Sequence, residues 1–289
     1  MSTDMSTNIS TEQLLIIGQG DIGLPVTNKL ADQGINVTGL ARSERSHYAL
    51  DDRAKFIQLD ALKLSTEQLQ DFTAIAIIVT PDEYSTSGYN ASYLSICQHL
   101  ADLVKQLPKL ERVVFISSTG VYGQDNGEWI DENTVPITPE RDASKVILQA
   151  EQALKQGFGD KAIIIRPSGI YGRERLMRLR KAREVKKDPI AHSAWSNRVM
   201  DSDLVTIITK VLTIDALQLL KPLYIATDYL PVTTFELMTW LSAQVGKSAP
   251  DIDTQKTATT GKRLHSNIPL AWLEFPDWQI GYHDILQHQ

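Results

Sequence analysis

Three glycines that directly follow a short apolar run constrain the fold of this chain more than any other feature. The segment reads Leu14-Leu15-Ile16-Ile17-Gly18-Gln19-Gly20-Asp21-Ile22-Gly23, with the spacing G-x-G-x-x-G and apolar residues at helical spacing after it. This order predicts a buried strand, a tight turn and a helix start. In such a turn Gly18 permits the reversal, Gly20 lets the backbone approach a pyrophosphate, and Gly23 lets the helix pack closely on the strand. We therefore expect residues 18–23 to bind a dinucleotide at the helix N-terminus.

The rest of the first half alternates short apolar runs with longer amphipathic stretches. We expect strands at 14–17, 36–40, 55–58, 74–79, 112–116 and 161–165, and helices near 23–33, 66–70, 89–106 and 143–156. The pattern is typical of an α/β fold, a Rossmann-like doubly wound parallel sheet with helices on both faces. Ligands of such sheets lie at the carboxyl ends of the strands, so the residues after each strand are the candidates for a site.

Length, charge and cysteine content narrow the class of protein. The chain has 289 residues, a net charge of −6 and one cysteine, Cys97. The length suits two domains or one large body with a smaller lobe, and the acidic charge argues against nucleic-acid and membrane partners. A single cysteine excludes an intrachain disulfide and fits a cytoplasmic location. We expect no membrane span, because the longest apolar runs have strand length, and no metal site, because the histidines lack ligand spacing.

Residues after the second, third and fourth strands are candidates for the adenosine end of the site. Arg42 and Ser43 stand where an acid usually accepts from the ribose 2′-hydroxyl, and the guanidinium favours a 2′-phosphate, so NADP is expected before NAD. A solvated loop is the alternative for Arg42. Asp60 and Ala61 follow the third strand and are placed to border an adenine, although Asp60 also suits a helix cap. Thr80 and Pro81 follow the fourth strand and begin a long polar loop that we expect over the cofactor.

Four motifs resemble those of the NAD-dependent epimerase/dehydratase family, part of the extended short-chain dehydrogenase/reductase group. They are Ser117-Ser118-Thr119-Gly120-Val121-Tyr122-Gly123, the lysine of Asp142-Ala143-Ser144-Lys145, Arg166-Pro167-Ser168-Gly169-Ile170-Tyr171-Gly172, and Arg198-Val199-Met200-Asp201-Ser202-Asp203-Leu204. The resemblance implies a nicotinamide cofactor contacted by Lys145, Pro167 and Ser168. It also implies a homodimer formed through the helices at 89–106 and 143–156.

The resemblance also implies that a serine, a tyrosine and a lysine transfer the proton, and this chain lacks the tyrosine. Ser118 matches the family's serine and Lys145 its lysine, but the position of the tyrosine, four residues before Lys145, holds Arg141. A guanidinium cannot give up a proton at a workable pH, so Arg141 cannot replace a phenol. Arg141 and Lys145 either hold an anion of the substrate or cofactor between them, or are two solvated cations.

Other residues are candidates for the missing acid or base. We expect Tyr122 first, because it lies four residues beyond Ser118 on the same loop, and then Tyr171, Tyr84 and Glu140. The alternative for Tyr122 is an aromatic packing role inside the motif V-Y-G. Water as the proton source is a further alternative.

The chain after Gly172 is expected to form the substrate lobe. Eight cations fall between residues 172 and 188 against three acids, which favours an anionic small-molecule substrate, or a solvated helix face. Arg173 and Trp195 are substrate candidates there, as are Arg141 and Tyr84. We expect a disordered tail over 1–12, a Rossmann domain over 13–168 to which 198–228 returns, and a mainly substrate-binding lobe over 169–289.

Two functions from different classes fit these features. The first is an NAD(P)-dependent oxidoreductase or epimerase-like enzyme acting on a small anionic or sugar-like carbonyl compound. The second is a catalytically inactive NADP-binding sensor or regulatory protein. Ser118 and Lys145 favour the enzyme, and Arg141 favours the sensor.

Overall fold

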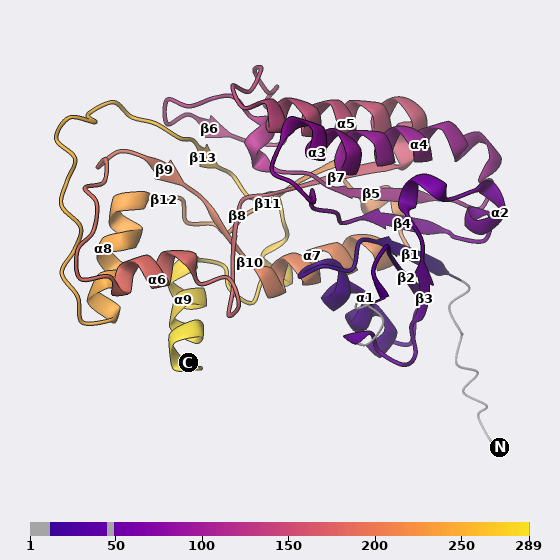
Figure 1. Ribbon diagram of the computed structural model, residues 1–289, viewed down its shortest axis with the longest axis horizontal. Helices are drawn as coiled ribbons and strands as arrows, with labels where there is room; N and C mark the ends of the chain where they lie inside the picture. The colour runs from indigo at the N-terminus through magenta and orange to yellow at the C-terminus, as the bar shows by residue number, and fades with distance from the viewer. Residues whose placement is uncertain (1–11, 45–48, 289) are drawn as a thin grey trace.

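A seven-stranded parallel sheet forms the centre of the protein (Figure 1). The computed structural model describes residues 12–44 and 49–288. The strands of the sheet are β1 (Gln13–Ile17), β2 (Asn36–Ala41), β3 (Lys55–Gln58), β4 (Ala74–Ile77), β5 (Arg112–Ile116), β7 (Ala162–Pro167) and β11 (Leu223–Ala226). Their order is β11-β7-β5-β4-β1-β2-β3, and every neighbouring pair is parallel. The predicted doubly wound parallel sheet is confirmed.

Helices cover both faces of this sheet because its strands are apolar on both sides. One face packs against α4 (Ser95–Leu103) and α5 (Asp142–Phe158), and the other against α1 (Gly23–Asp32) and α7 (Asp201–Thr213) (Figure 1). In β1, Leu15 and Ile17 belong to the first core and Leu14 and Ile16 to the second, which is the two-residue period of a strand. Two four-residue helices, α2 (Thr66–Leu69) and α3 (Thr86–Tyr89), precede α4 in the chain. Leu69 of α2 belongs to the first core, and Tyr89 of α3 packs against it.

A third apolar core lies outside the sheet, at the left of Figure 1. It is formed by α6 (Met177–Arg183), α8 (Thr234–Gln244) and α9 (Trp278–Gln287). Three two-stranded sheets lie outside the main sheet: β8 (Gly169–Tyr171) with β10 (Arg198–Met200), β9 (Trp195–Ser196) with β12 (Val232–Thr233), and β6 (Trp129–Ile130) with β13 (Arg263–Leu264). The predicted division into a Rossmann domain over 13–168, to which 198–228 returns, and a mainly substrate-binding lobe over 169–289 stays a prediction.

The helix expected over 89–106 begins earlier and is interrupted. Ser85 caps α3 by accepting from Gly88 N, and a wider turn of π type spans Asn90–Leu94 before α4. Asn90 Nδ2 and Ser92 Oγ donate to backbone carbonyls four residues back, and such bonds compete with the regular helical pattern. The expected strand 74–79 ends at Ile77, which leaves Ile78 and Val79 for the wall of a cavity.

The predicted N-terminal tail falls outside the described residues except for Glu12, whose Oε1 lies 3.4 Å from Arg112 Nη2. Within residues 12–44 and 49–288, every helix is too short or too polar to cross a membrane.

Candidate active site

The glycine turn between β1 and α1 is built as its spacing predicts. Gly18 has φ +96°, and a Cβ there would lie 2.1 Å from Ile78 O. A Cβ at Gly23 would lie 1.9 Å from Gly18 O, so only glycine lets α1 begin this close to the turn. A Cβ at Gly20 would meet nothing within 4 Å. Gly18 and Gly23 therefore serve the turn itself, whereas Gly20 leaves open space in front of the backbone.

That open space belongs to a cavity of about 750 Å³ at the carboxyl edge of the sheet. Its walls come from the turns that follow β1, β2, β3, β4, β5 and β7, as expected for a parallel sheet. It includes the predicted cofactor residues Gly18, Gln19, Gly20, Asp21, Ile22, Gly23, Arg42, Ser43, Asp60, Ala61, Thr80 and Pro167. The volume is within the range of small-molecule and cofactor sites.

Arg42 lies at one end of this cavity and is engaged by a carboxylate. Its Nη1 and Nη2 donate to Asp82 Oδ2 at 2.8 Å and Asp82 Oδ1 at 2.5 Å. The Arg42 guanidinium holds the pKa of Asp82 below its usual range. Asp60, at the same end, accepts from Leu62 N and caps a short helical turn. Sequence reasoning placed Arg42 at the cavity but did not anticipate Asp82.

The opposite end of the cavity is formed by residues that follow β5 and β7. Ser117 and Pro167 line it, and Ser168 follows with its amide donating to Ala226 O. The Ser168 Oγ is buried and finds no hydrogen-bond partner among the described residues. Ser168 itself does not line the cavity, but it is adjacent in sequence to Pro167, which does, and its buried hydroxyl has an unused donor and acceptor.

Beneath Ser117 lies a buried ionic network that connects β5, α5 and β7. Ser117 Oγ donates to Glu151 Oε1 at 2.5 Å, and Arg166 donates to Glu151 from Nε at 2.9 Å and Nη2 at 2.6 Å. Arg166 also lies over the ring of Tyr122, 4.6 Å from its centroid. Both charged side chains are almost fully buried, so each compensates the charge of the other. Sequence reasoning missed Ser117 and Glu151, because nothing in the local pattern pairs residues 34 positions apart.

Two segments flank this network. Ser118 lies on the loop after β5, and Arg141 and Lys145 lie at the N-terminal end of α5. Ser118 Oγ accepts from Gly120 N at 3.0 Å, and Lys145 Nζ lies 2.8 Å from Asp142 Oδ1. Arg141 stands at the N-cap of α5. Asp142, in the first turn of α5, offsets the unfavourable position of a cation near a helix N-terminus. None of these residues lines the cavity in the described part of the chain.

The candidate phenols are not presented to the cavity. Tyr122 is 1% exposed and its hydroxyl donates to Asp131 O at 3.3 Å, so the ring packs in the core. Tyr171 is buried and stacked on Tyr282, and burial raises its pKa. Tyr84 is 88% exposed. The cavity instead includes Tyr93, which lies in the helix expected over 89–106. Burial raises the pKa of Tyr93 to about 12, so its hydroxyl stays protonated at neutral pH.

The predicted substrate residues of the second lobe are engaged elsewhere. Arg173 Nη2 lies 3.0 Å from Asp284 Oδ2, and Arg263 lies over the ring of Trp195. Arg175, two residues beyond Arg173, does line the cavity, and its Nη2 lies 2.9 Å from Asp21 Oδ2 on the glycine turn. The excess of cations over residues 172–188 predicted a substrate site in this region. It did not show which of the two arginines lines the cavity.

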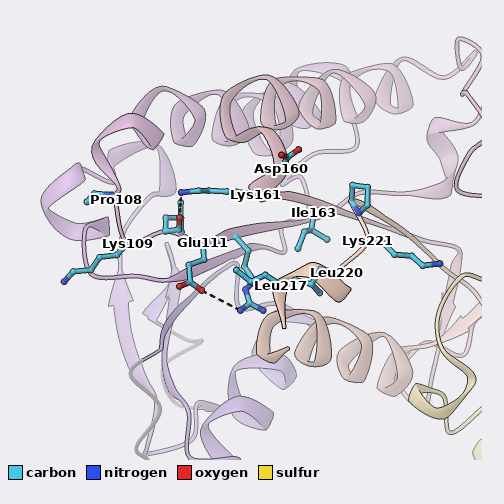
Figure 2. Close-up of a pocket in the computed structure, with 12 residues that line it drawn as sticks. Pro108, Lys109, Glu111, Asp160, Lys161, Ile163, Leu217, Leu220 and Lys221 are labelled. Carbon is cyan, nitrogen blue, oxygen red and sulfur yellow. Dashed lines mark hydrogen bonds and ion pairs between the residues drawn. The ribbon is translucent and has the colours of Figure 1, made fainter. Parts of the chain in front are cut away.

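A second cavity, of about 650 Å³, opens at the other edge of the sheet, near the amino ends of β5, β7 and β11 (Figure 2). Lys109 and Lys221 extend away from its centre and pair with Asp71 and Glu132. Lys161 Nζ donates to Leu110 O at 2.5 Å. This cavity contains none of the predicted site residues, and its cations have partners, so the carboxyl edge is the candidate active site.

The carboxyl-edge cavity fits a pyridine dinucleotide on the chain's own geometry. Gly20 leaves room in front of the turn, helix α1 starts at its edge, and Ser117 and Pro167 line the far end. The nucleotide and nicotinamide ends would be held by the turns after β2 and β3 and after β5 and β7 respectively.

Comparison with known proteins agrees with this geometry. Residues 14–195 match the model of the NAD dependent epimerase/dehydratase family. A provisionally assigned NAD-dependent epimerase/dehydratase from Methylobacillus flagellatus is 31% identical, with a TM-score of 0.79 over 96% of this chain and 99% of that chain. A search of curated proteins found no match.

More distant solved structures share the fold. UDP-glucuronic acid 4-epimerase from Bacillus cereus, in complex with NAD, has a TM-score of 0.74 at 18% identity, covering 95% of this chain and 99% of that chain. The dTDP-glucose 4,6-dehydratase from Bacillus anthracis, also with NAD, has a TM-score of 0.70 at 18% identity, covering 96% of both chains.

Proposed function

The chain belongs to the NAD dependent epimerase/dehydratase family, and from this premise we propose that it is an NAD(P)-binding oxidoreductase or epimerase-like enzyme with an atypical active site. Its substrate is a small anionic or sugar-like carbonyl compound. One observation carries the proposal: a single cavity runs from the glycine turn to Ser117 and Pro167, and Ile170 and Arg175 lie on its wall.

Different residues of the cavity bind different parts of the cofactor. Gly20 and the start of α1 accept the pyrophosphate, since a Cβ at Gly20 would meet nothing within 4 Å and a helix N-terminus offers amides to an anion. Asp60 and Ala61 border the adenosine, and Pro167 lies at the nicotinamide end with Ser168 next to it in the chain. When bound, the nicotinamide supplies a hydride acceptor or donor. NAD and NADP are both compatible with the family.

Proton handling is the atypical part of the site. Ser118 and Lys145 take the places of two family residues, but Arg141 stands where the third has a phenol. Tyr93 lines the cavity, and its raised pKa makes its hydroxyl a hydrogen-bond donor and a poor base at neutral pH. We infer that the Ser118 hydroxyl and solvent exchange the proton with the substrate oxygen, and that Lys145 contributes positive charge. Neither side chain lines the cavity, so the substrate has to extend beyond it towards Ser118, and Lys145 has to leave Asp142.

The anionic or sugar-like class of substrate is supported by two features. Arg175 brings a guanidinium from the second lobe to the cavity wall. The Bacillus cereus and Bacillus anthracis proteins of the same fold are named for UDP-glucuronic acid and dTDP-glucose. Arg173 and Trp195 stay predicted substrate residues; reaching the cavity would require them to leave Asp284 and Arg263.

A second function, a cofactor-binding protein without turnover, is favoured by the environment of Lys145. Its ammonium group is paired with Asp142, no phenol stands one turn away, and Tyr122 and Tyr171 are buried. A protein with this site would bind NAD(P) and report its concentration or redox state to a partner.

A turnover screen separates the two functions. Purified protein is incubated with NADH, NADPH or their oxidised forms and with carbonyl compounds and nucleotide sugars. Nicotinamide absorbance follows net redox reactions, and chromatography of the sugar follows epimerisation or dehydration. Turnover that falls at least about tenfold in Ser118→Ala supports the enzyme. Tight nucleotide binding with no product for any substrate class supports the sensor.

A further inference from the structure

The ion pair between Arg42 and Asp82 crosses the adenosine end of the cavity. Arg42 follows β2 and Asp82 follows β4, and these two strands flank β1 in the sheet. The pair therefore lies next to the glycine turn, and both residues line the cavity. Both guanidinium Nη atoms are used, at 2.8 and 2.5 Å from the two carboxylate oxygens. This two-point geometry is the one in which arginine also binds a phosphate.

A 2′-phosphate and Asp82 would therefore compete for the same face of Arg42. The end of the second strand is where the adenosine ribose lies in dinucleotide folds. A phosphate there must displace the carboxylate or lie beside it, and like charges at close distance repel. A 2′-hydroxyl carries no charge, and it can donate to a carboxylate that stays on Arg42.

The other charged residues of the cavity do not compensate. Asp60 and Glu83 lie at the same end, and Asp21 with Arg175 lies further along. Four carboxylates therefore face two guanidinium groups among the charged lining residues of the described chain. Each guanidinium has a carboxylate at hydrogen-bond distance. Among the described residues that line the cavity, every guanidinium is therefore already paired; Arg45 lies outside the described residues.

We propose that Asp82 sets the cofactor preference of this protein by neutralising Arg42, so that NAD(H) binds at least as tightly as NADP(H). The proposal rests on the proposed function only in that the cavity binds a pyridine dinucleotide. It reverses the expectation drawn from Arg42 in isolation, because a guanidinium that already binds a carboxylate attracts a phosphate weakly. Asp82 is a specificity-determining residue on the loop after β4.

Isothermal titration calorimetry with NADH and NADPH tests this on the wild type and three variants. Asp82→Asn removes the charge and keeps the size of the side chain. Glu83→Gln is the matched control, since it removes the same charge from the adjacent lining residue, which is not paired with Arg42. The double variant Arg42→Ala/Asp82→Asn removes the group that the proposal says is released. Both paired residues are largely exposed, so the fold is retained.

The proposal expects Asp82→Asn to raise the affinity for NADPH relative to NADH about tenfold. Glu83→Gln should change this ratio less than about twofold, and the double variant should lose the gain. An unchanged ratio in Asp82→Asn, or an equal gain in Glu83→Gln, overturns the proposal while nucleotide binding itself stands. If neither nucleotide binds the wild type or any variant, the proposed function fails as well.

Discussion

Glu151 and Arg166 form a bidentate ion pair inside the protein, with Arg166 Nη2 2.6 Å and Nε 2.9 Å from the carboxylate oxygens. The pair joins α5 to β7 directly below the end of β5, and its third member, Ser117, lies on the cavity wall. The position of Ser117 on the cavity wall therefore depends on a buried ion pair.

Replacing one member of this pair should be costly. Glu151→Gln leaves the Arg166 guanidinium buried without a counter-charge, and we expect a loss of about 3–5 kcal/mol in the free energy of unfolding. Urea denaturation followed by circular dichroism measures it. The control is Asp71→Asn, which breaks the exposed pair with Lys109 and should cost less than about 1 kcal/mol. A loss below about 1 kcal/mol for Glu151→Gln would show that the pair is not needed for the fold.

Tyr122→Phe separates packing from chemistry at the residue that the sequence put first as the acid or base. The ring lies under Arg166 and the hydroxyl donates a hydrogen bond to Asp131 O. We expect the variant to lose about 0.5–1.5 kcal/mol of stability and to keep its nucleotide affinity. Thermal unfolding and calorimetry measure the two quantities. Loss of turnover on an identified substrate, at unchanged stability, would instead support the catalytic role.

Asp228 should make the stability of the protein fall as the pH rises. Burial raises its pKa to about 8, the Asp277 carboxylate adds to the shift, and Arg198 and nearby backbone amides oppose it. The folded state then holds a proton that the unfolded state loses near pH 4, so unfolding becomes easier between about pH 4 and pH 8.

Asp228→Asn removes this titration and keeps an acceptor for Leu230 N. The variant should be more stable than the wild type by about 1–3 kcal/mol at pH 8 and should match it near pH 4. Urea denaturation across this pH range checks the slope. A wild-type profile that is flat, or that rises towards pH 8, would mean that Asp228 is ionised in the folded protein.

The sequence predicted what depends on local patterns. The glycine spacing located the turn, and the apolar periods located the six sheet strands that precede β11. The roles that the family motifs give to Ser118 and Lys145 stay predictions. What it missed depends on contacts between distant residues. Asp82 opposite Arg42, Glu151 beneath Ser117 and Arg175 beside Asp21 come together only through the order of the strands. Tyr93 lies in the helix expected over 89–106, and apolar spacing in a helix does not distinguish a face that packs in the core from one that lines a cavity.

The glycine turn offers a sharp test of which positions serve folding and which serve binding. Gly20→Ala places its Cβ in open space, so the free energy of unfolding should change by less than about 0.5 kcal/mol, while the affinity for a pyridine nucleotide falls about tenfold or more. Gly18→Ala, with φ +96° and a clash with Ile78 O, should destabilise the fold by about 2 kcal/mol or more. Equal losses of stability in both variants would contradict this assignment.

The central claim is that the cavity at the carboxyl edge of the sheet holds a pyridine dinucleotide, and titration calorimetry of the nucleotide-free wild type measures this directly. We predict saturable binding of NADH with one site per chain and a Kd of roughly 1–100 µM. The absence of any binding heat for NADH and NADPH at about 1 mM nucleotide, with the fold intact, would contradict the account.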